Sequence, residues 1–284
     1  MKKSIFVIIL AAFMAMPMFM SSCKKAEPKP IALQLYSVRQ NMDSSAVWTI
    51  EQVAKIGYKY VEAAGYKDGK FYGMDPVAFA ELLKKNGIDF LSSHTGQPVP
   101  DSANWNKTMA WWDTCIAAHK IAGVKYIVQP FMDSVGYTSL AGVKRYCDYF
   151  NAVGEKCNAA GIKFGYHNHD REFKSIDSTV IYDYMLKNTD STKVFFEMDL
   201  WWIYIGGGNA LEYFAKYPGR FTLLHIKDEY EVGGSGKIDW KAIFDKASLA
   251  GAKYYVVEQE EYKTTALDGA KKSFDYLENA DFVK

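Results

Sequence analysis

The chain has 284 residues, of which 49% are hydrophobic and 24% charged, and its formal net charge at pH 7 is +1. This charge balance disfavours a nucleic-acid-binding protein, because such domains carry a strongly basic patch or stripe. The hydrophobic fraction and the 15% aromatic content exclude an intrinsically disordered chain. We therefore expect a globular protein whose partner is small and neutral or weakly charged.

The N-terminus has the features of a secretory signal. Lys2 and Lys3 precede an apolar run over residues 5–20, and small residues follow directly before Cys23. The run is shorter than the about 20 residues that a membrane-spanning helix needs. Small residues before a cysteine resemble the lipobox of bacterial lipoproteins, so we expect a lipoprotein signal over residues 1–23 with Cys23 as the lipid-bearing residue. An ordinary cleaved signal is the alternative.

Residues 24–30 (KKAEPKP) are rich in lysine and proline, and we expect them to form an extended tether. Acyl chains on Cys23 would hold the exported protein to a membrane through this anchor alone, on the periplasmic side or at the cell surface. The remaining residues, 31–284, have the length of one large domain.

A repeated unit runs along residues 31–284. In each unit an amphipathic helix ends at a glycine, where a left-handed residue closes a helix, and an apolar β-rich run begins at once. The glycines are Gly57, Gly87, Gly123, Gly161, Gly219 and Gly251. With the runs IALQLY and KVFFEMD, the sequence predicts eight strands. Eight βα units within roughly 250 residues predict a single-domain α/β protein with a parallel (β/α)8 TIM barrel.

A doubly wound open sheet is the alternative, because it uses the same units. That fold usually has a glycine-rich phosphate loop after its first strand. Here the corresponding place holds Tyr36, Ser37, Val38 and Arg39, which favours the barrel.

The cysteines beyond Cys23 are Cys115, Cys147 and Cys157, all in predicted helices. Cys147 and Cys157 share one predicted helix and lie roughly 15 Å apart along it, which is too far for a disulfide. We expect all three to be buried thiols.

Ionisable side chains gather at the carboxyl ends of the last four predicted strands, where TIM-barrel enzymes carry their active sites. Residues two apart on a strand share a face. The pairs that point one way are therefore His167 with His169, Glu197 with Asp199, His225 with Lys227, and Glu258 with Glu260. A single histidine of this kind is more often structural, but several buried ionisable groups near one axis are costly unless paired or bound to a metal.

Four of these side chains, His167, Asp199, His225 and Glu258, can converge on one divalent ion. A mixture of nitrogen and oxygen ligands favours Mn²⁺, Zn²⁺, Fe²⁺ or Co²⁺ over Ca²⁺. The sequence therefore predicts one divalent metal ion at the open end of the barrel.

With these residues in place, the chain resembles the xylose-isomerase-like superfamily of sugar isomerases and epimerases across essentially all of residues 31–284. The segments that carry the likeness are LQLYSVR, YVEAAGY, SSHTG, GYHNHDREF, FEMDLWW, LLHIKD and VVEQEEY. That family commonly holds a metal with Glu, Asp, His and Glu from its last four strands. The resemblance carries the last three ligands to Asp199, His225 and Glu258, but the strand-five position has His167 in place of glutamate.

This difference bears on the expected reaction. The epimerases resembled here use their two ligating glutamates as acid and base on opposite faces of a carbon, so His167 favours single-base chemistry. We expect a metal-dependent, sugar isomerase/epimerase-like enzyme that moves a proton next to a carbonyl of a small carbohydrate through an enediolate. The alternatives are a keto-sugar or keto-glycoside lyase or hydratase on the same barrel and a non-catalytic sugar-binding lipoprotein. A DNA-repair endonuclease with this barrel is disfavoured by export and by the charge.

The expected catalytic groups lie beside the ion. Glu258 or His169 would move the proton. Lys227 would steady the developing oxyanion, or would instead form a salt bridge with a carboxylate such as Glu229.

The expected substrate-binding residues lie around the same opening. His94 and Glu62 are candidates for contacts to sugar hydroxyls, and packing is the alternative for each. Trp201 or its neighbour Trp202 would stack on a sugar ring, or both are core residues. His119 lies in the middle of a predicted helix, away from the strand ends.

Overall fold

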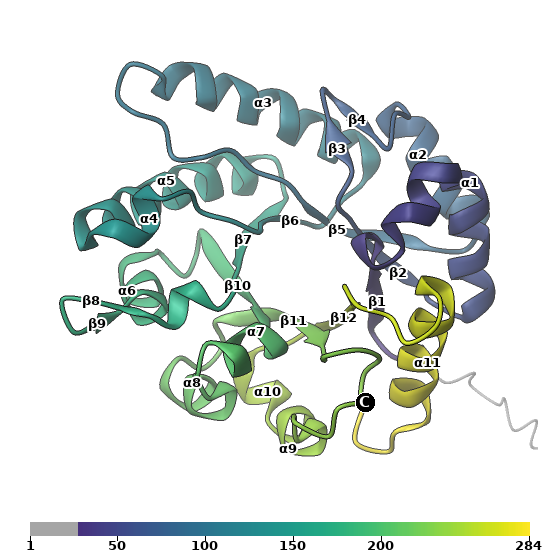
Figure 1. The fold of residues 1–284 in the computed structure, drawn as a ribbon. Coiled ribbons are helices and arrows are strands. Elements are labelled where there is room, and N and C mark those ends of the chain that lie inside the picture. Colours follow the sequence, from purple (N-terminus) through teal and green to yellow (C-terminus); the bar gives the residue numbers. More distant parts are fainter. Residues whose placement is uncertain (1–27) are drawn as a thin grey trace, which may run out of the picture.

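The computed structural model describes residues 28–284, so the predicted signal, Cys23 and the first part of the tether lie outside the described residues. Within that range eight parallel strands close into a barrel in the order β1-β12-β11-β10-β7-β6-β5-β2 (Figure 1). The barrel strands are β1 (Ile31–Gln34), β2 (Tyr60–Ala63), β5 (Asp89–His94), β6 (Tyr126–Gln129), β7 (Lys163–His167), β10 (Val194–Asp199), β11 (Phe221–Lys227) and β12 (Tyr254–Glu258). Because β1 pairs with both β12 and β2, the barrel is confirmed and the open-sheet alternative is wrong.

Helices surround the barrel and connect its successive strands (Figure 1). They are η1 (Leu35–Val38), α1 (Arg39–Ile56), α2 (Pro76–Lys85), α3 (Trp105–Ala122), α4 (Val135–Thr138), α5 (Leu140–Ala159), η2 (Arg171–Phe173), α6 (Ile181–Asn188), α7 (Leu200–Ile205), α8 (Ala210–Lys216), α9 (Trp240–Asp245), α10 (Ala247–Ala250) and α11 (Ala266–Asn279). Two hairpins extend the loops after β2 and β7: β3 (Tyr66–Lys67) with β4 (Lys70–Phe71), and β8 (Ser175–Ile176) with β9 (Thr179–Val180). Among the described residues, no helix combines the length and apolar character needed to cross a membrane.

The helix-ending glycines fulfil their predicted role. All six have positive φ, from 67° at Gly87 to 128° at Gly57. L-residues with a side chain rarely adopt this conformation, so glycine is what allows each helix to turn directly into the next strand.

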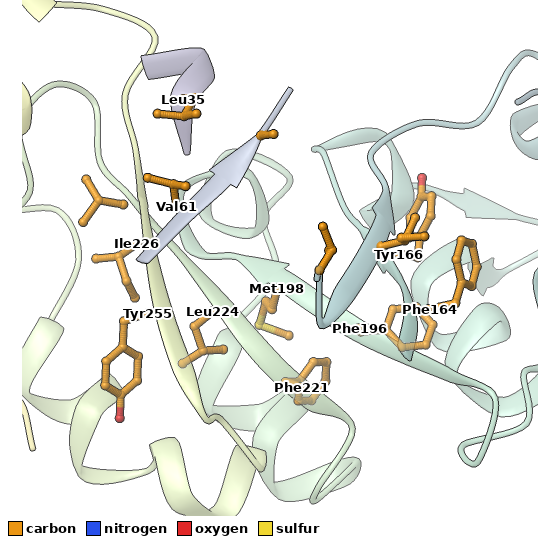
Figure 2. Packing of buried hydrophobic residues seen from close by; sticks show 14 of the residues in the cluster. Leu35, Val61, Phe164, Tyr166, Phe196, Met198, Phe221, Leu224, Ile226 and Tyr255 are labelled. Carbon is orange, nitrogen blue, oxygen red and sulfur yellow. The ribbon is translucent and has the colours of Figure 1, made fainter. Parts of the chain in front are cut away.

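The apolar core has two parts. The larger part lies between the strands and the surrounding helices, where Phe196 and Met198 of β10 and Leu224 and Ile226 of β11 take part in it (Figure 2). A separate cluster fills the inside of the barrel and consists of Ala32, Leu91, Tyr126, Val128, Phe195, Leu223 and Val256. This apolar plug closes the barrel interior, as is usual for the fold.

Strand alternation places polar side chains directly above the plug. Phe195 is followed two residues later by Glu197, and Leu223 is followed by His225, and residues two apart share a face. The polar groups therefore lie inside the barrel near the carboxyl ends of the strands, and the plug lies beneath them.

The chain enters the barrel at the opposite end, where Ile31 begins β1. The Lys29 ammonium donates hydrogen bonds to the carbonyls of Leu277, Glu278 and Ala280, at 3.1, 2.7 and 2.9 Å. These carbonyls lie at the C-terminus of α11, where a helix leaves its acceptors unpaired and a cation is favourable. Lys29 therefore fixes the point of entry.

Cys115, Cys147 and Cys157 are buried free thiols, as predicted. His119 is fully buried in α3, and its Nδ1 lies 2.7 Å from the carbonyl oxygen of Cys115. Its ring packs against Tyr66 and Phe71, far from solvent, so its role is structural.

Candidate metal centre and active site

Four side chains from adjacent strands meet at the carboxyl end of the barrel. His167 ends β7, Asp199 ends β10, His225 lies in β11 and Glu258 ends β12, and one ligand atom of each lies within 4.8 Å of all the others. His167 Nε2 lies 3.3 Å from Asp199 Oδ2 and 3.2 Å from His225 Nδ1. His225 Nδ1 lies 3.4 Å from Asp199 Oδ2 and 3.6 Å from Glu258 Oε2. The structure thus brings the four predicted ligands together.

The spacing of these atoms fits a cation. Bonds of about 2.0–2.2 Å to a tetrahedral ion place neighbouring ligand atoms roughly 3.3–3.6 Å apart. Four of the six separations are close to this range, at 3.2–3.6 Å. All four side chains are buried, and two carboxylates with two converging imidazole nitrogens are costly to bury without a positive charge among them. The donor set therefore fits one divalent metal ion.

Asp199 is oriented by the start of α7. Its Oδ1 accepts hydrogen bonds from the backbone N–H groups of Trp201 and Trp202, at 2.9 and 2.7 Å, so Asp199 caps the helix. Its other oxygen, Oδ2, is left for the ion. Burial would raise the pKa of Asp199, but hydrogen bonds from His167 and His225 and the charge of Lys227 hold it well below its ordinary value.

His225 is oriented from below. Its Nε2 lies 2.9 Å from Glu62 Oε1, so the ring directs Nδ1 at the ion site. Glu62 Oε1 also accepts a hydrogen bond of 2.8 Å from Gln34 Nε2, and Gln34 Oε1 accepts one of 2.9 Å from the backbone N–H of Tyr36. Carboxylates in this position fix the tautomer and orientation of a ligating histidine.

A second group of four, Glu62, His94, Glu197 and His225, shares His225 with the first. His94 Nε2 lies 2.7 Å from Glu197 Oε2 and 3.0 Å from Glu62 Oε1. With the 2.9 Å contact between His225 and Glu62, these separations are hydrogen-bond lengths, shorter than the edges of a metal tetrahedron. We therefore interpret this group as a buried hydrogen-bond network that supports the ion site.

The surroundings of His94 and Glu197 in this network raise the pKa of both side chains. Burial would lower the pKa of His94, but the charge of Glu62 and a hydrogen bond with Glu197 raise it to about 9. Burial, and then the charge of Glu62, raise the pKa of Glu197 to about 7. Both shifts favour a protonated His94 between the carboxyl groups of Glu62 and Glu197.

A cavity of about 440 Å³ opens above the ion site. Its lining contains four of the predicted site residues, namely His94, His167, His169 and Glu258. The other lining residues are Tyr36, Ala64, Tyr66, Thr95, Gly96, Pro130, Phe131 and Glu260. They come from the loops after β1, β2, β5, β6 and β12, so the cavity extends from the ion site across the mouth of the barrel.

Two predicted sugar contacts lie elsewhere. Glu62 is fully buried in the network beneath the ion site and does not line the cavity. Trp201 stacks on Tyr204, with ring centroids 5.5 Å apart, and is also outside the lining. Trp202 is closer to the site, because its ring lies 5.5 Å from that of His169.

Lys227 is buried beside Glu258. Its ammonium lies 3.1 Å from Glu258 Oε2 and 2.8 Å from Glu260 Oε1, and it lies 4.6 Å from the centroid of the Trp202 ring. Glu229, the salt-bridge partner that we considered for Lys227, pairs with Lys237 instead. The ammonium of Lys227 is therefore paired with the carboxylates of Glu258 and Glu260.

Glu197 and Gln34 have no role that was predicted from the sequence. Glu197 carried a usable signal, because it lies two residues before Asp199 on the same strand face. For Gln34, the only signal in the sequence was its position at the end of the first strand. Its two hydrogen bonds depend on where β1 lies relative to β2, which a sequence does not show.

Comparisons with known proteins give the class of this barrel. Residues 50–280 match the family described as the xylose isomerase-like TIM barrel. A crystal structure described as a sugar phosphate isomerase/epimerase from Parabacteroides distasonis is 34% identical, with a TM-score of 0.84 over 90% of this chain and 100% of that one. The chain therefore belongs to the xylose isomerase-like TIM barrel family.

More distant relatives are enzymes of two kinds. Inosose dehydratase of Salmonella typhimurium is 25% identical over 298 residues, covering 86% of this chain and 98% of that protein. A D-psicose 3-epimerase from Clostridium cellulolyticum is 17% identical, with a TM-score of 0.66 over 86% of this chain and 89% of that one. The second likeness shows the fold alone.

Proposed function

We propose that this protein is a divalent-metal-dependent enzyme that removes a proton next to the carbonyl of a hydroxy-ketone sugar. The observation that carries the proposal is the convergence of His167, Asp199, His225 and Glu258 at the floor of an open cavity. A bound Mn²⁺, Zn²⁺, Fe²⁺ or Co²⁺ would polarise the neighbouring sugar oxygens and so acidify the adjacent C–H. The small, neutral substrate predicted from the composition suits this site.

Glu258 is our candidate base. It lines the cavity, and only its Oε2 belongs to the ligand set. Burial would raise the pKa of Glu258, but the charge of Lys227 and a hydrogen bond from His225 lower it more, so the carboxylate form is present at working pH. We propose that Lys227 serves the reaction by holding Glu258 ionised and in place.

His169 is our candidate for the opposite proton step. It follows β7, whereas Glu258 ends β12, and β10 and β11 lie between these strands in the barrel. Both side chains line the cavity, so a proton can leave the sugar on one side and be supplied to an oxygen or carbon on the other. Isomerisation results when the neighbouring carbon takes the proton and the hydroxyl proton passes from the first oxygen to the second, so that the carbonyl forms at the first carbon.

Elimination is the second candidate reaction. It begins with the same proton removal, after which the C–O bond next to the enediolate breaks and the leaving oxygen takes a proton from His169 or His94. His167 supports it, because it stands where the epimerases resembled here carry their second glutamate. The likeness to inosose dehydratase points the same way. The substrate would then be a keto-sugar or a keto-glycoside.

The test is proton exchange in deuterated buffer. Metal-loaded protein is incubated with ketoses and keto-glycosides, with and without chelator, and the carbon next to the ketone is followed by NMR. We expect exchange that stops with chelator and in Glu258→Gln, and that continues in the surface control Glu155→Gln. Isomer and unsaturated product distinguish the two reactions. Exchange that survives both treatments contradicts the proposal, and sugar binding retained in a metal-free His225→Ala variant would support a non-catalytic binding protein.

We also propose that the protein is exported and anchored through lipid on Cys23, as its N-terminal sequence indicates. Cys23→Ala should then move the protein from the membrane fraction to the soluble fraction and abolish labelling with a fatty acid. Unchanged fractionation would contradict the anchor.

A further inference from the structure

The charges around the cavity do not suit a phosphate group. Of the described residues that line it, none is a lysine or an arginine, whereas Glu258 and Glu260 are carboxylates. Lys227 lies between these two carboxylates and is paired with both. Proteins bind phosphate with arginine, lysine or the free N–H groups of a helix N-terminus.

The helix nearest to the ion site offers no such N–H groups. The backbone N–H groups of Trp201 and Trp202 at the start of α7 both donate to Asp199 Oδ1. Apart from the proposed ion and His94, which is paired with Glu62 and Glu197, a phosphate dianion in the cavity would therefore meet carboxylates and no lysine, arginine or free helix terminus.

Two partly exposed aromatic rings line the cavity. Tyr36 and Phe131 line it from the loops after β1 and β6, and they are 42% and 36% exposed. Two contacts hold Tyr36 in place. Its backbone N–H donates a hydrogen bond of 2.9 Å to Gln34 Oε1, and the Arg39 guanidinium lies 4.5 Å from the centroid of its ring. Fixed aromatic faces open to a cavity suit the C–H face of a sugar ring, which keeps its hydroxyls hydrated.

The size of the cavity agrees with two binding positions. Its volume of about 440 Å³ falls in the range of roughly 300–1,000 Å³ that holds drug-sized ligands, which exceeds the need of one monosaccharide. One ring at the ion site would therefore leave space in the cavity for a second ring against its aromatic lining.

We propose that the cavity binds an uncharged glycoside, with one sugar at the ion site and a second ring against the aromatic lining that Tyr36 and Phe131 contribute, in preference to a sugar phosphate. This inference rests on the proposed function, because it names the substrate class of that same site.

The experiment is equilibrium binding to the metal-loaded full chain, measured by titration calorimetry. The probes are methyl β-glucoside with one ring, phenyl β-glucoside and cellobiose with two, and glucose compared with glucose 6-phosphate. None of them carries a preformed ketone next to the ion site, so the glycosides report binding without turnover. The variants are Tyr36→Ala and Phe131→Ala, and the control is Trp48→Ala, an aromatic residue of α1 that is 47% exposed and outside the cavity.

We expect the two-ring probes to bind more tightly than methyl β-glucoside, and each cavity variant to weaken them by roughly two- to tenfold while one-ring binding is unchanged. Trp48→Ala should have no effect, and glucose 6-phosphate should bind no more tightly than glucose. Tighter binding of the phosphate ester, no gain from the second ring, or two-ring binding untouched by both variants overturns the inference. Because the exchange assay is separate, a two-ring preference without exchange contradicts only the reaction, and exchange without that preference contradicts only the substrate class.

Discussion

His225 Nε2 lies 2.9 Å from Glu62 Oε1, and this contact determines which nitrogen of His225 faces the metal centre. A neutral imidazole has one N–H and one lone pair. When Nε2–H donates to Glu62, Nδ1 is the nitrogen that faces Asp199 and Glu258, and with an ion bound its lone pair would coordinate the ion in place of the hydrogen bonds to these carboxylates. Glu62 therefore serves the ion site although it does not touch the cavity.

Glu62→Gln should weaken metal binding by about 10–100-fold, the usual effect of removing the partner of a ligating histidine. The amide loses the negative charge that favours His225 Nε2–H. Competition with a fluorescent chelator measures the affinity, and Glu155→Gln, whose carboxylate is on the surface, is the matched control. Equal affinities in Glu62→Gln and the wild type would mean that His225 is oriented by other contacts.

Removal of the metal should lower the melting temperature. An ion present at about 100 times its Kd stabilises the folded state by about 2.7 kcal/mol. For a domain of this size that corresponds to roughly 5–10 °C. Differential scanning calorimetry with and without chelator measures the shift, and Asp199→Asn should make it small. A variant that retains the full shift would show that the ion binds elsewhere.

The positions of the four ligands could be predicted because two regularities fix them. Glycine-terminated helices located the strands, and alternation along β10 and β11 showed which of Met198, Asp199, His225 and Ile226 point inward. The height of each side chain in the barrel was not predictable. The register of β2 against β5 shifts between Val61 and Glu62, and such local irregularities decide whether a carboxylate reaches the cavity or stays beneath it.

Trp201 illustrates a second limit of the sequence. It directly follows Asp199, which suggested a place beside the substrate. Its direction depends on the first turn of α7, which Asp199 caps through Oδ1, and this turn carries the ring to Tyr204 instead. The local cap of α7 therefore sets the direction of Trp201, which its place directly after Asp199 did not show.

His119 should make the protein less stable in acid. Burial lowers the pKa of His119 to about 4, whereas an unfolded histidine has a pKa near 6.5. The folded state thus disfavours the charged form of His119. The stability that neutral His119 contributes is therefore fully present above pH 6.5 and is lost as the pH falls towards 4. The loss is about 3 kcal/mol at most.

Urea unfolding between pH 7 and pH 4, with chelator throughout, measures this effect. The free energy of unfolding should fall more steeply with acid in the wild type than in His119→Phe. Parallel curves for the two proteins would assign the acid sensitivity to other groups.

Two helix-ending glycines provide a matched pair for backbone strain. Gly123 and Gly251 have φ of 78° and 88°, but an added Cβ meets nothing within 4 Å at Gly123, whereas at Gly251 it lies 2.8 Å from the Cα of Gly219. Gly123→Ala should cost about 1–2 kcal/mol for the left-handed conformation. Gly251→Ala should cost about 1–3 kcal/mol more because backbone must move. Urea unfolding gives both values, and equal losses would show that Gly219 yields without cost.

The chain joins the barrel at Ile31, and Lys29 fastens that junction to the end of α11. All eight strands of the described barrel run the same way, so the junction and the cavity belong to opposite ends of the molecule. If the protein were attached to a membrane through the segment before Pro28, the entrance of the cavity would therefore face away from that membrane. A sugar diffusing in solution would then reach the entrance directly, without passing between the protein and the membrane.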